Sequence, residues 1–399
     1  MFSSKSGNVV LLSEGDTPHE RQRLGISMHC HTRHSREILD FVPYYAERIP
    51  IIAWAWRRSM RRRMERLGSV PNFDHGYWEP PLEGHEVVAS ETASLASLGL
   101  GAIVSITDHD SIEGAQDAGP KAPISMEWTV PFRNAFFHVG VHNMPREEAD
   151  DITATLLAYT NAEGESDDDK LAEILEMLDE KRGVLVILNH PIWDIEMIGQ
   201  QAHERALKLF VSVHGHRLHA IEVNGFRSWG ENLQAIQLAE ELRKPIVSGG
   251  DRHCCQANTM VNATAAETFE EFVDDVRVRG ESTIVVRPEY HAALPTRQLT
   301  SMHQILARYD AGARSRWIDR IHIDAFGDDS LTTLSEYWEG KEPLWAKGVL
   351  SVLALMTNPL VKPIIAACVG DIDVGRNDNE APEIALIDRP QGYATSWMS

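Results

Sequence analysis

Short apolar runs rich in β-branched residues recur along the chain, and most of them end in a histidine, carboxylate or amide side chain. Such continuous runs are typical of strands that are buried on both faces, as in parallel sheets. Helix-like stretches separate several of the runs, for example residues 168–181 and 231–243. The predicted strands cover residues 24–28, 101–107, 123–126, 134–137, 183–188, 218–223 and 245–250. This alternation predicts an α/β fold built on a parallel barrel or a doubly wound sheet.

The polar residues that end these strands are the types that bind metal ions. His29 and His31 are separated by one residue, and alternation along a strand would place both imidazoles on the same face. In barrels, side chains at the C-terminal ends of the strands gather at one site. Neutral imidazoles and carboxylates that meet there suit divalent ions such as Zn, Mn or Fe(II). Any one of these histidines alone is more often a packed or surface residue, and only the joint pattern predicts a multinuclear metal centre.

The set of motifs resembles the PHP (polymerase and histidinol phosphatase) family over roughly residues 24–290. The resemblance rests on residue types, their order and their position after strands. The stretch from Thr107 to Gly114 (TDHDSIEG) is especially similar to the second motif of that family. The matching residues are His29, His31, Asp108, His109, Asp110, Glu127, His138, Asn189, His190, Pro191, Asp251 and His253.

The resemblance implies a distorted (β/α)7 TIM-like barrel and a site of two to three divalent metal ions that hydrolyses phosphoesters by a metal-bridged hydroxide. A first metal would be bound by His29, His31 and Asp251, and Glu127 would bridge it to a second. His138 and His190 would complete the second site, and His109 and His253 would bind the third. Glu127, Asp251 and Asp108 are the candidate catalytic residues.

The segment after His31 departs from the commoner family pattern, which would place an aspartate at position 36. Arg36 stands there, and Glu37 matches the spacing of one branch of the family, so Glu37 is the expected further ligand. His34 and His142 are alternative ligands. For these two and for the histidines at 214, 216 and 219, a packed or surface position is the favoured interpretation.

Phosphate oxygens also need cationic donors, and arginine fits them with two parallel hydrogen bonds. Four arginines lie in or next to the predicted site loops: Arg33, Arg36, Arg227 and Arg252. Imidazole ligands further need neighbours that fix their tautomers, and the candidates are Asp108, Asp110 and Asn189.

The amino-acid composition limits the classes of ligand that we expect the protein to bind. The formal net charge is −21, from 38 basic and 59 acidic residues, and this acidity disfavours long nucleic acid as a ligand. A small phosphorylated substrate is less affected, because metal ions would dominate the local field. The four cysteines show no disulfide spacing, and no signal peptide is visible, so we expect a cytoplasmic protein.

Three parts are expected: an N-terminal segment 1–23, a barrel 24–298 with an insertion at about 38–82, and a mostly helical extension 299–399. The insertion contains a basic, Trp-bearing stretch over residues 48–63. A helix packed on the barrel or a lid over the site is favoured there over contact with an anionic membrane. In the extension, helices are expected over 301–323 and 331–338. The apolar residues 348–370 predict two short buried helices, 349–356 and 361–368, and 377–399 a tail.

Three functions remain open on the sequence. The first is a metal-dependent phosphoesterase acting on a small phosphorylated metabolite, nucleotide or short oligonucleotide. The second is a metal-dependent hydrolase of a non-phosphate bond, similar to amidohydrolases. The third is a non-catalytic scaffold stabilised by metal. The sequence does not indicate the oligomeric state.

Overall fold

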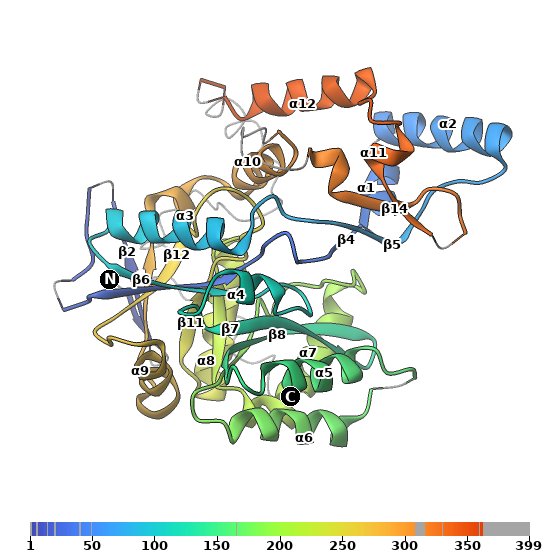
Figure 1. Cartoon of the computed structure of the whole chain (residues 1–399). Coiled ribbons are helices and arrows are strands. Elements are labelled where there is room, and N and C mark those ends of the chain that lie inside the picture. Colours follow the sequence, from blue (N-terminus) through green and yellow to red (C-terminus); the bar gives the residue numbers. More distant parts are fainter. Residues whose placement is uncertain are drawn as a thin grey trace.

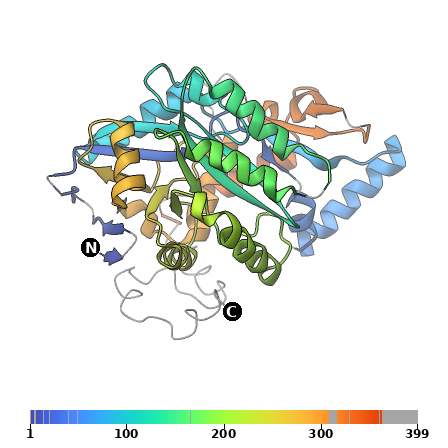
Figure 2. The same cartoon turned by 90° about the horizontal axis from the view of Figure 1, so that it is seen from below.

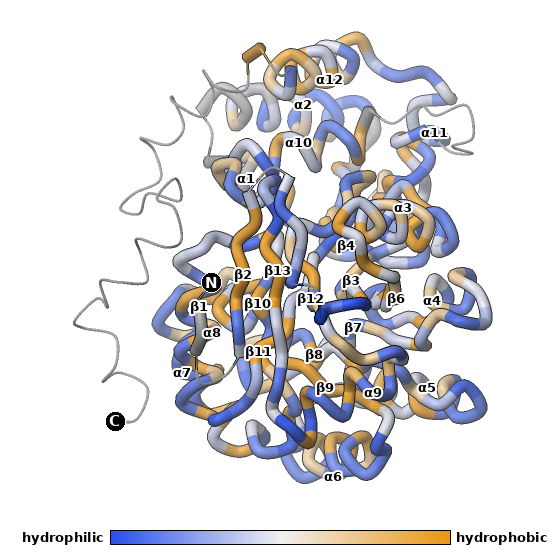
Figure 3. The backbone as a smooth tube through the Cα atoms, turned by 90° about the vertical axis from the view of Figure 1, so that its left-hand side faces the viewer, coloured by the Kyte–Doolittle hydropathy of each residue, from blue (hydrophilic) through white to orange (hydrophobic). Residues whose placement is uncertain are grey.

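The α/β architecture is confirmed. A computed structural model of the chain describes residues 2–4, 7–13, 15–19, 21–39, 41–48, 50–164, 166–307, 316–328, 330–358 and 360–361 (Figure 1). Its strands form three sheets, with orders β1-β2-β13-β12-β3-β6, β11-β10-β9-β8-β7 and β15-β14-β5-β4. The first two carry the predicted strands, and Figure 3 shows that their central strands are mostly hydrophobic.

Each predicted strand that ends in a ligand-type residue is present. They are β3 (Leu24–Cys30), β6 (Gly101–Ile106), β7 (Ile124–Phe132), β8 (Ala135–Met144), β9 (Leu185–Leu188), β10 (Ala220–Asn224) and β11 (Ile246–Gly249). β3 runs parallel to β6, and β10 runs parallel to both β9 and β11. As the sequence pattern predicts, β9, β10 and β11 are buried throughout and β3 is buried beyond Leu24, whereas β6 is buried only over its last three residues.

No described sheet closes on itself, but the edges of the first two sheets meet at isolated bridges. His109 pairs with Glu127, which joins the segment after β6 to β7, and Cys30 pairs with Arg252, which joins β3 to the segment after β11. The amide of Gly250 also donates a hydrogen bond to the carbonyl of Met28 at 2.9 Å. The edges of the two sheets are therefore held together where the ligand-type residues lie.

Helices cover these sheets, and their apolar faces form the core. The helices are α3 (Gly84–Ser97), α4 (Glu113–Asp117), α5 (Ala149–Thr160), α6 (Asp168–Asp179), α7 (Gln200–His214), α8 (Trp229–Leu242) and α9 (Phe269–Asp274). Figure 2 shows the chain from the side of α5 and α6. Another buried cluster joins Ile26 of β3, Ile187 of β9 and Val247 of β11 to Phe272 of α9, so strands of both sheets share one core.

β7 and β8 depart from the expected parallel pattern. They form a long antiparallel hairpin in which Phe132 pairs with Ala135 across a two-residue turn. Arg133, the first turn residue, has a φ of 57°, a left-handed value that suits such tight hairpins. Glu127 and His138 therefore lie within strands rather than at strand ends. A short apolar run followed by a polar residue does not reveal that the strand continues beyond it.

The insertion and the C-terminal extension combine into one accessory module. The third sheet pairs β4 (Glu37–Ile38) and β5 (Asn72–Trp78) with β14 (Ile321–Asp324) and β15 (Leu331–Thr333). Its helices are α1 (Phe41–Arg48), α2 (Pro50–Leu67), α10 (Leu294–Ala307), α11 (Leu334–Tyr337) and α12 (Leu344–Met356). Figure 1 shows α2, α11 and α12 at the same end of the molecule.

Several expectations for these regions need correction. The helix expected over 301–323 ends with α10 at Ala307, and Ile321–Asp324 is a strand. The stretch 331–338 is the strand β15 followed by α11. A helix is present over 349–356 as part of α12, but the expectation that it is buried is wrong, because Val349, Val352 and Leu355 are exposed. The helix expected over 361–368 and the tail 377–399 lie outside the described residues except for Val361. Among the described helices, none is long and apolar enough to span a membrane.

The N-terminal segment is part of the main body. The strand β2 (Gly7–Leu11) pairs in parallel with β13 (Thr283–Val286), and β1 (Phe2–Ser4) pairs antiparallel with β2. β12 (Met260–Thr264) then links β13 to β3 by antiparallel pairing. The first sheet therefore contains β1, β2, β12 and β13 in addition to the predicted strands β3 and β6.

His219 shows the structural role that the sequence favoured for it. Its Nδ1 accepts a hydrogen bond from the Val186 amide at 2.8 Å, and its Nε2 lies 2.8 Å from Oδ1 of Asp179. Burial lowers the pKa of His219 to about 4, although Asp179 opposes the shift. The neutral ring is thus the form that joins β9 to the end of α6.

We expect His219→Gln to be destabilised by about 1–3 kcal/mol at neutral pH, because two buried hydrogen bonds are disturbed. The unfolded chain takes up this proton near pH 6.5, whereas the folded chain takes it up near pH 4. Stability contributed by His219 is therefore lost as the pH falls from 6.5 to 4, and the difference from wild type should shrink. Urea denaturation at several pH values measures this. The exposed His216→Gln variant is the control, and a difference that stays constant with pH would contradict the assignment.

Candidate metal centre

A buried carboxylate on β7 is the centre of the cluster. Glu127 is fully buried, and each of its oxygens is surrounded by ring nitrogens. The distances to Oε2 are 3.0 Å from His29 Nε2, 3.3 Å from His109 Nδ1 and 3.4 Å from His31 Nε2, and those to Oε1 are 3.2 Å from His138 Nδ1 and 3.1 Å from His190 Nε2. One glutamate thus joins five histidines that come from four strands or the loops that follow them.

The backbone twists sharply where the first two histidines leave β3. The pairing of β3 with β6 shifts register between Met28 and Cys30, and His29 has a φ of 61°. Both His29 and His31 still point to Glu127, and Cys30 faces away from the cluster, where its Sγ lies 3.3 Å from Asn258 Nδ2. Regular alternation along a strand predicts the direction of both histidines correctly, but in the structure a bulge at His29 helps to set that direction. Bulges of this kind often reorient side chains near active sites.

Two further carboxylates, Glu37 and Asp251, approach histidines of the same cluster. Glu37 of β4 has its Oε2 3.1 Å from His253 Nε2 and 3.3 Å from His109 Nε2. Asp251 has its Oδ1 3.7 Å from His29 Nε2 and 3.8 Å from His31 Nε2. The expectation that Glu37 takes the place of an aspartate at position 36 agrees with this geometry.

Neighbouring groups determine which nitrogen of each imidazole carries the proton. Oε1 of Glu222 on β10 lies 2.5 Å from His29 Nδ1, so that nitrogen donates and His29 Nε2 is the nitrogen that would exchange its proton for a metal ion. Ser35 donates its own proton to Glu37 at 2.6 Å and therefore accepts one from His31 Nδ1 at 3.2 Å. The Nε2 atoms of both rings face Glu127, and partners of this kind on Nδ1 are typical of metal-binding histidines.

The electrostatics couple the charges of the cluster. Burial alone would raise the pKa of Glu127, but the imidazoles around it, His29 first, hold it well below 4.5. Burial would lower the pKa of His29, yet Glu127 and Glu222 outweigh it and raise the pKa well above 6.5. For His138 burial dominates and lowers the pKa to about 4. The carboxylates are thus ionised, and positive charge must lie among them.

The residues fit divalent metal ions. Four groups of histidine and acidic residues could each hold an ion, because within each group the ligand atoms, one from each residue, all lie within 4.8 Å of one another. Within the described part of the chain, the buried atoms His31 Nε2 and His138 Nδ1 have no hydrogen-bond partner, although each is aimed at Glu127. The groups are His31, Glu37, His109 and His253; His29, His31 and Asp251; His29, His190 and Glu222; and His109, Glu127 and His138.

The other predicted polar residues lie around the cluster rather than in it. Asp108 accepts hydrogen bonds from the amide and hydroxyl of Thr32 at 2.5 and 2.7 Å, so it holds the loop after His31 in place. Asp110 accepts from the amide of Thr129 at 2.9 Å, and Asn189 donates to Oε1 of Glu127 at 2.9 Å. Asp108 thus acts as a positioning residue in this structure and does not touch the ligand atoms.

The two alternative ligands are placed elsewhere. His142 is buried beside Ser105 Oγ at 2.8 Å, and His34 lies 2.9 Å from Oε2 of Glu113 at the surface. His138 rather than His142 faces Glu127, which resolves the choice of register along β8.

The four arginines have four different environments. Arg227 has Nη2 3.2 Å from Oδ2 of Asp251 and its guanidinium 3.6 Å over the ring of Trp193. Arg33 pairs with Glu83 at 2.7 Å, and Arg36 is exposed and lies over the ring of Tyr77. Arg227 is thus the arginine that reaches the cluster.

The expectation for Arg252 is wrong. Its side chain is buried, pairs with Glu91 and donates to the carbonyls of Cys254 and Cys255. A buried charge of this kind needs such partners, so the side chain of Arg252 ties α3 to the chain after β11 and is not available to a phosphate.

Sequence reasoning missed Glu222 and Ser35. Glu222 also accepts hydrogen bonds from the His190 amide and from Asn224 Nδ2, so it links two imidazole-bearing loops. Its signal was a lone carboxylate inside the otherwise apolar strand 220–224. A buried charge costs free energy unless it has partners, so an acidic residue in the middle of such a strand indicates a polar site.

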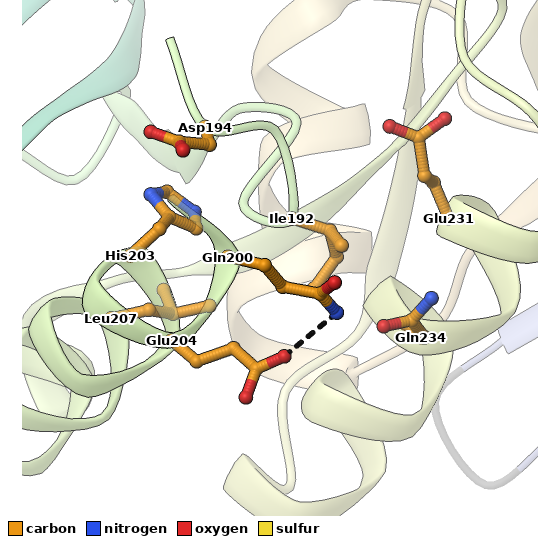
Figure 4. A pocket seen from close by; sticks show the side chains of 8 residues that line it. All are labelled: Ile192, Asp194, Gln200, His203, Glu204, Leu207, Glu231 and Gln234. Atoms are coloured by element: carbon orange, nitrogen blue, oxygen red, sulfur yellow. Dashed lines mark hydrogen bonds between the residues drawn. The ribbon is translucent and has the colours of Figure 1, made fainter. Parts of the chain in front are cut away.

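A separate cavity of about 310 Å³ lies between α7 and α8 (Figure 4). It is lined by Ile192, Asp194, Gln200, His203, Glu204, Leu207, Glu231 and Gln234. It contains none of the cluster residues. The ring of His203 connects it to the loop after His190, since its Nε2 bonds the carbonyl of Pro191 at 2.9 Å.

No protein-family model and no curated protein matches the sequence. Among solved structures the chain is similar to PsfC from Pseudomonas syringae PB-5123, with 17% identity, a TM-score of 0.34, and coverage of 51% of this chain and 85% of that one. An amidohydrolase from Chromobacterium violaceum has 15% identity, a TM-score of 0.32, and coverage of 57% and 87%.

A protein from Bifidobacterium adolescentis, provisionally assigned as a metal-dependent phosphoesterase, has 13% identity, a TM-score of 0.30, and coverage of 58% and 88%. Similarity this low assigns neither an activity nor a fold to this chain. Its function must therefore be inferred from the chemistry of the cluster.

We expect Glu222→Gln to weaken metal binding roughly 10- to 100-fold, the usual effect of losing a carboxylate that orients a ligand histidine. An amide can donate to His29 Nδ1 and so permit the wrong tautomer. Competition against a chromophoric chelator measures the affinity, and Glu173→Gln, an exposed glutamate on α6, is the matched control. Affinity equal to wild type in both variants would contradict the role of Glu222.

Proposed function

We propose that this protein is a PHP-like, metal-dependent hydrolase of phosphoesters. The observation that carries the proposal is the buried Glu127, whose two oxygens lie within 3.4 Å of five imidazoles. Structural metal sites are usually closed sets of four ligands, whereas shared carboxylates with many ligands are typical of multinuclear hydrolytic sites.

The strand arrangement supports a distorted (β/α)7 barrel as the scaffold. The ring would run through β3, β6, β7, β8, β9, β10 and β11, and the bridges His109–Glu127 and Cys30–Arg252 lie where the two sheets meet. The shared cluster of Ile26, Ile187 and Val247 is what the interior of such a ring would contain.

Three metal positions follow from the donor groups. His29, His31 and Asp251 would hold the first ion, and Glu127 would bridge it to the second. His138 and His190, both within 3.2 Å of Glu127, would complete the second position. His109, His253 and Glu37 would hold the third. Zn, Mn and Fe(II) all suit this set, because imidazole and carboxylate ligands do not choose among them.

Bound ions would supply an activated water and neutralise the charge on phosphoryl oxygens. The chain itself would then provide a cation beside them. Arg227 is fixed by Trp193 and Asp251, and its buried Nε has no hydrogen-bond partner among the described residues, so the guanidinium has a donor to spare. A guanidinium in this position suits a phosphoryl oxygen better than a neutral carbonyl. This favours a phosphoester over an amide or lactone as the substrate.

The substrate would be a small phosphorylated metabolite, a nucleotide or a short oligonucleotide. The strongly acidic body disfavours a long nucleic acid, whose binding depends on many basic contacts.

The test is phosphate release from a panel of monoesters, nucleotides and short oligonucleotides, with protein reconstituted with Mn, Zn or Fe(II). We expect release with at least one metal and its loss in Asp251→Ala, whose metal content is measured in parallel. If metal-loaded wild type releases no phosphate but hydrolyses a carbon–nitrogen or lactone substrate, the proposal fails and the non-phosphate hydrolase replaces it. If it hydrolyses neither class, the metal-stabilised scaffold replaces it.

Arg227→Met should lower kcat/KM for a phosphoester roughly 10- to 100-fold, the loss expected for a hydrogen bond to a charged group. Metal content should stay close to that of wild type, because Arg227 is not a ligand. Arg205→Met, at an exposed position on α7, is the matched control. Unchanged kinetics in Arg227→Met would remove Arg227 from the substrate site.

A further inference from the structure

The outer face of α12 is apolar and exposed. Five large hydrophobic side chains on this helix are between 49% and 85% exposed: Leu344, Trp345, Val349, Val352 and Leu355. The inner face packs through Ala346 and Leu350 against Trp317 and Trp338. Lys347 is the single charged residue within the bounds of α12. An exposed face of this kind is unusual on a protein surface and marks a binding surface.

The outer face of α2 combines a tryptophan with a row of arginines. Trp54 is 66% exposed and Met64 is 49% exposed. The chain has six arginines and a single glutamate between residues 57 and 66, although its net charge is −21. Five of these arginines are exposed: Arg57, Arg58, Arg61, Arg62 and Arg66. The expectation that the Trp-bearing face packs on the barrel is wrong, because α2 packs instead on the accessory module.

α2 and α12 are held at the same end of the molecule by α11. The buried Arg63 of α2 lies with its guanidinium 4.4 Å from the ring of Tyr337, and Trp338 contacts Trp345 with ring centres 5.9 Å apart. Figures 1 and 3 show both helices at this end, away from α5 and α6. Exposed basic side chains of α2 and exposed apolar side chains of α12 thus lie at the same end of an otherwise acidic protein.

We propose that this α2–α12 end docks on an anionic lipid surface. Exposed arginines attract acidic headgroups, and each basic residue near such a surface adds to the binding. Tryptophans favour the boundary between headgroups and acyl chains, and a short apolar helix lying in that boundary gains from burying its face. α12 has 13 residues, which suits a helix lying along a membrane surface and is too short for one that crosses it. This departs from the sequence expectation, which disfavoured membrane contact.

Lipid accounts for this surface better than the alternatives. A nucleic acid would use the arginines but leave the apolar face of α12 exposed, and the acidic body would repel it. A symmetric dimer through this end would bring two sets of α2 arginines together, and like charges at close range oppose association. An anionic surface with an apolar layer beneath it provides partners both for the arginines of α2 and for the apolar face of α12.

The experiment is flotation of the full-length protein with vesicles of phosphatidylcholine, with and without phosphatidylglycerol. We expect flotation with the anionic vesicles and much less with the neutral ones, and a decrease as salt is raised. Arg58→Gln combined with Arg61→Gln and Arg62→Gln should reduce partitioning roughly 100-fold, since each basic residue contributes about fivefold. Trp345→Ser with Val352→Ser should reduce it roughly tenfold or more.

Matched controls replace the same residue types elsewhere. Arg205→Gln on α7 and Val278→Ser, whose side chain is 78% exposed just after α9, should float as wild type does. Thermal unfolding confirms that each variant is folded, and because these surface changes touch no core residue, Tm should move little.

Four outcomes would overturn the proposal. The first is no flotation of folded wild type with either vesicle. The second is sedimentation equilibrium showing a dimer that the Trp345→Ser and Val352→Ser variant abolishes, which would assign the face to a second copy. The third is binding of a short RNA that the arginine variant abolishes while vesicles do not compete. If removal of residues 362–399 is needed before flotation is seen, the face is covered by that segment of the chain and the proposal fails for the intact protein.

Discussion

The central constraint on this structure is the burial of an ionised carboxylate. Glu127 has no exposed surface, and a charge removed from water must be compensated by partners in contact with it. Five imidazoles provide them, and they come from four separate stretches of the chain, since His29 and His31 both lie at the end of β3. The bulge at His29 and the bridges between the sheets both occur where these side chains meet. The fold near the site is therefore organised around the neutralisation of one charge.

Much of this could be predicted from the sequence, because the signals are local. Buried parallel strands are continuous apolar runs, and the ligand-type residues that follow them stand out against that background. His29, His31, His109, Glu127, His138, His190, Asp251 and His253 all meet in the structure, and so does Glu37. The helices predicted over 168–181 and 231–243 correspond to α6 and α8, whose ends differ from the prediction by two residues at most.

The failures involve information that is not local. Whether an arginine faces a site depends on partners that are distant in the sequence. Arg252 forms a buried ion pair with Glu91, which precedes it by 161 residues. The pairing of β5 with β14 joins segments separated by more than half the chain, so the insertion and the extension look independent in the sequence. Glu222 was overlooked because a single acidic residue in a strand does not indicate a role until its partner, His29, is known.

The accessory module has a consequence for anyone who wishes to simplify this protein. Glu37 belongs to β4, which pairs with Trp78 of β5, and the ring of Trp78 lies beside that of His253. β4, which carries the candidate ligand Glu37, is thus supported by β5, which belongs to a segment that the sequence analysis treated as an insertion. Trimming residues 38–82 would remove the support of Glu37 together with the exposed helices. A smaller unit that keeps the metal-ligand cluster intact therefore cannot be excised from this chain, and domain-grafting designs would have to transplant the accessory module with the first two sheets.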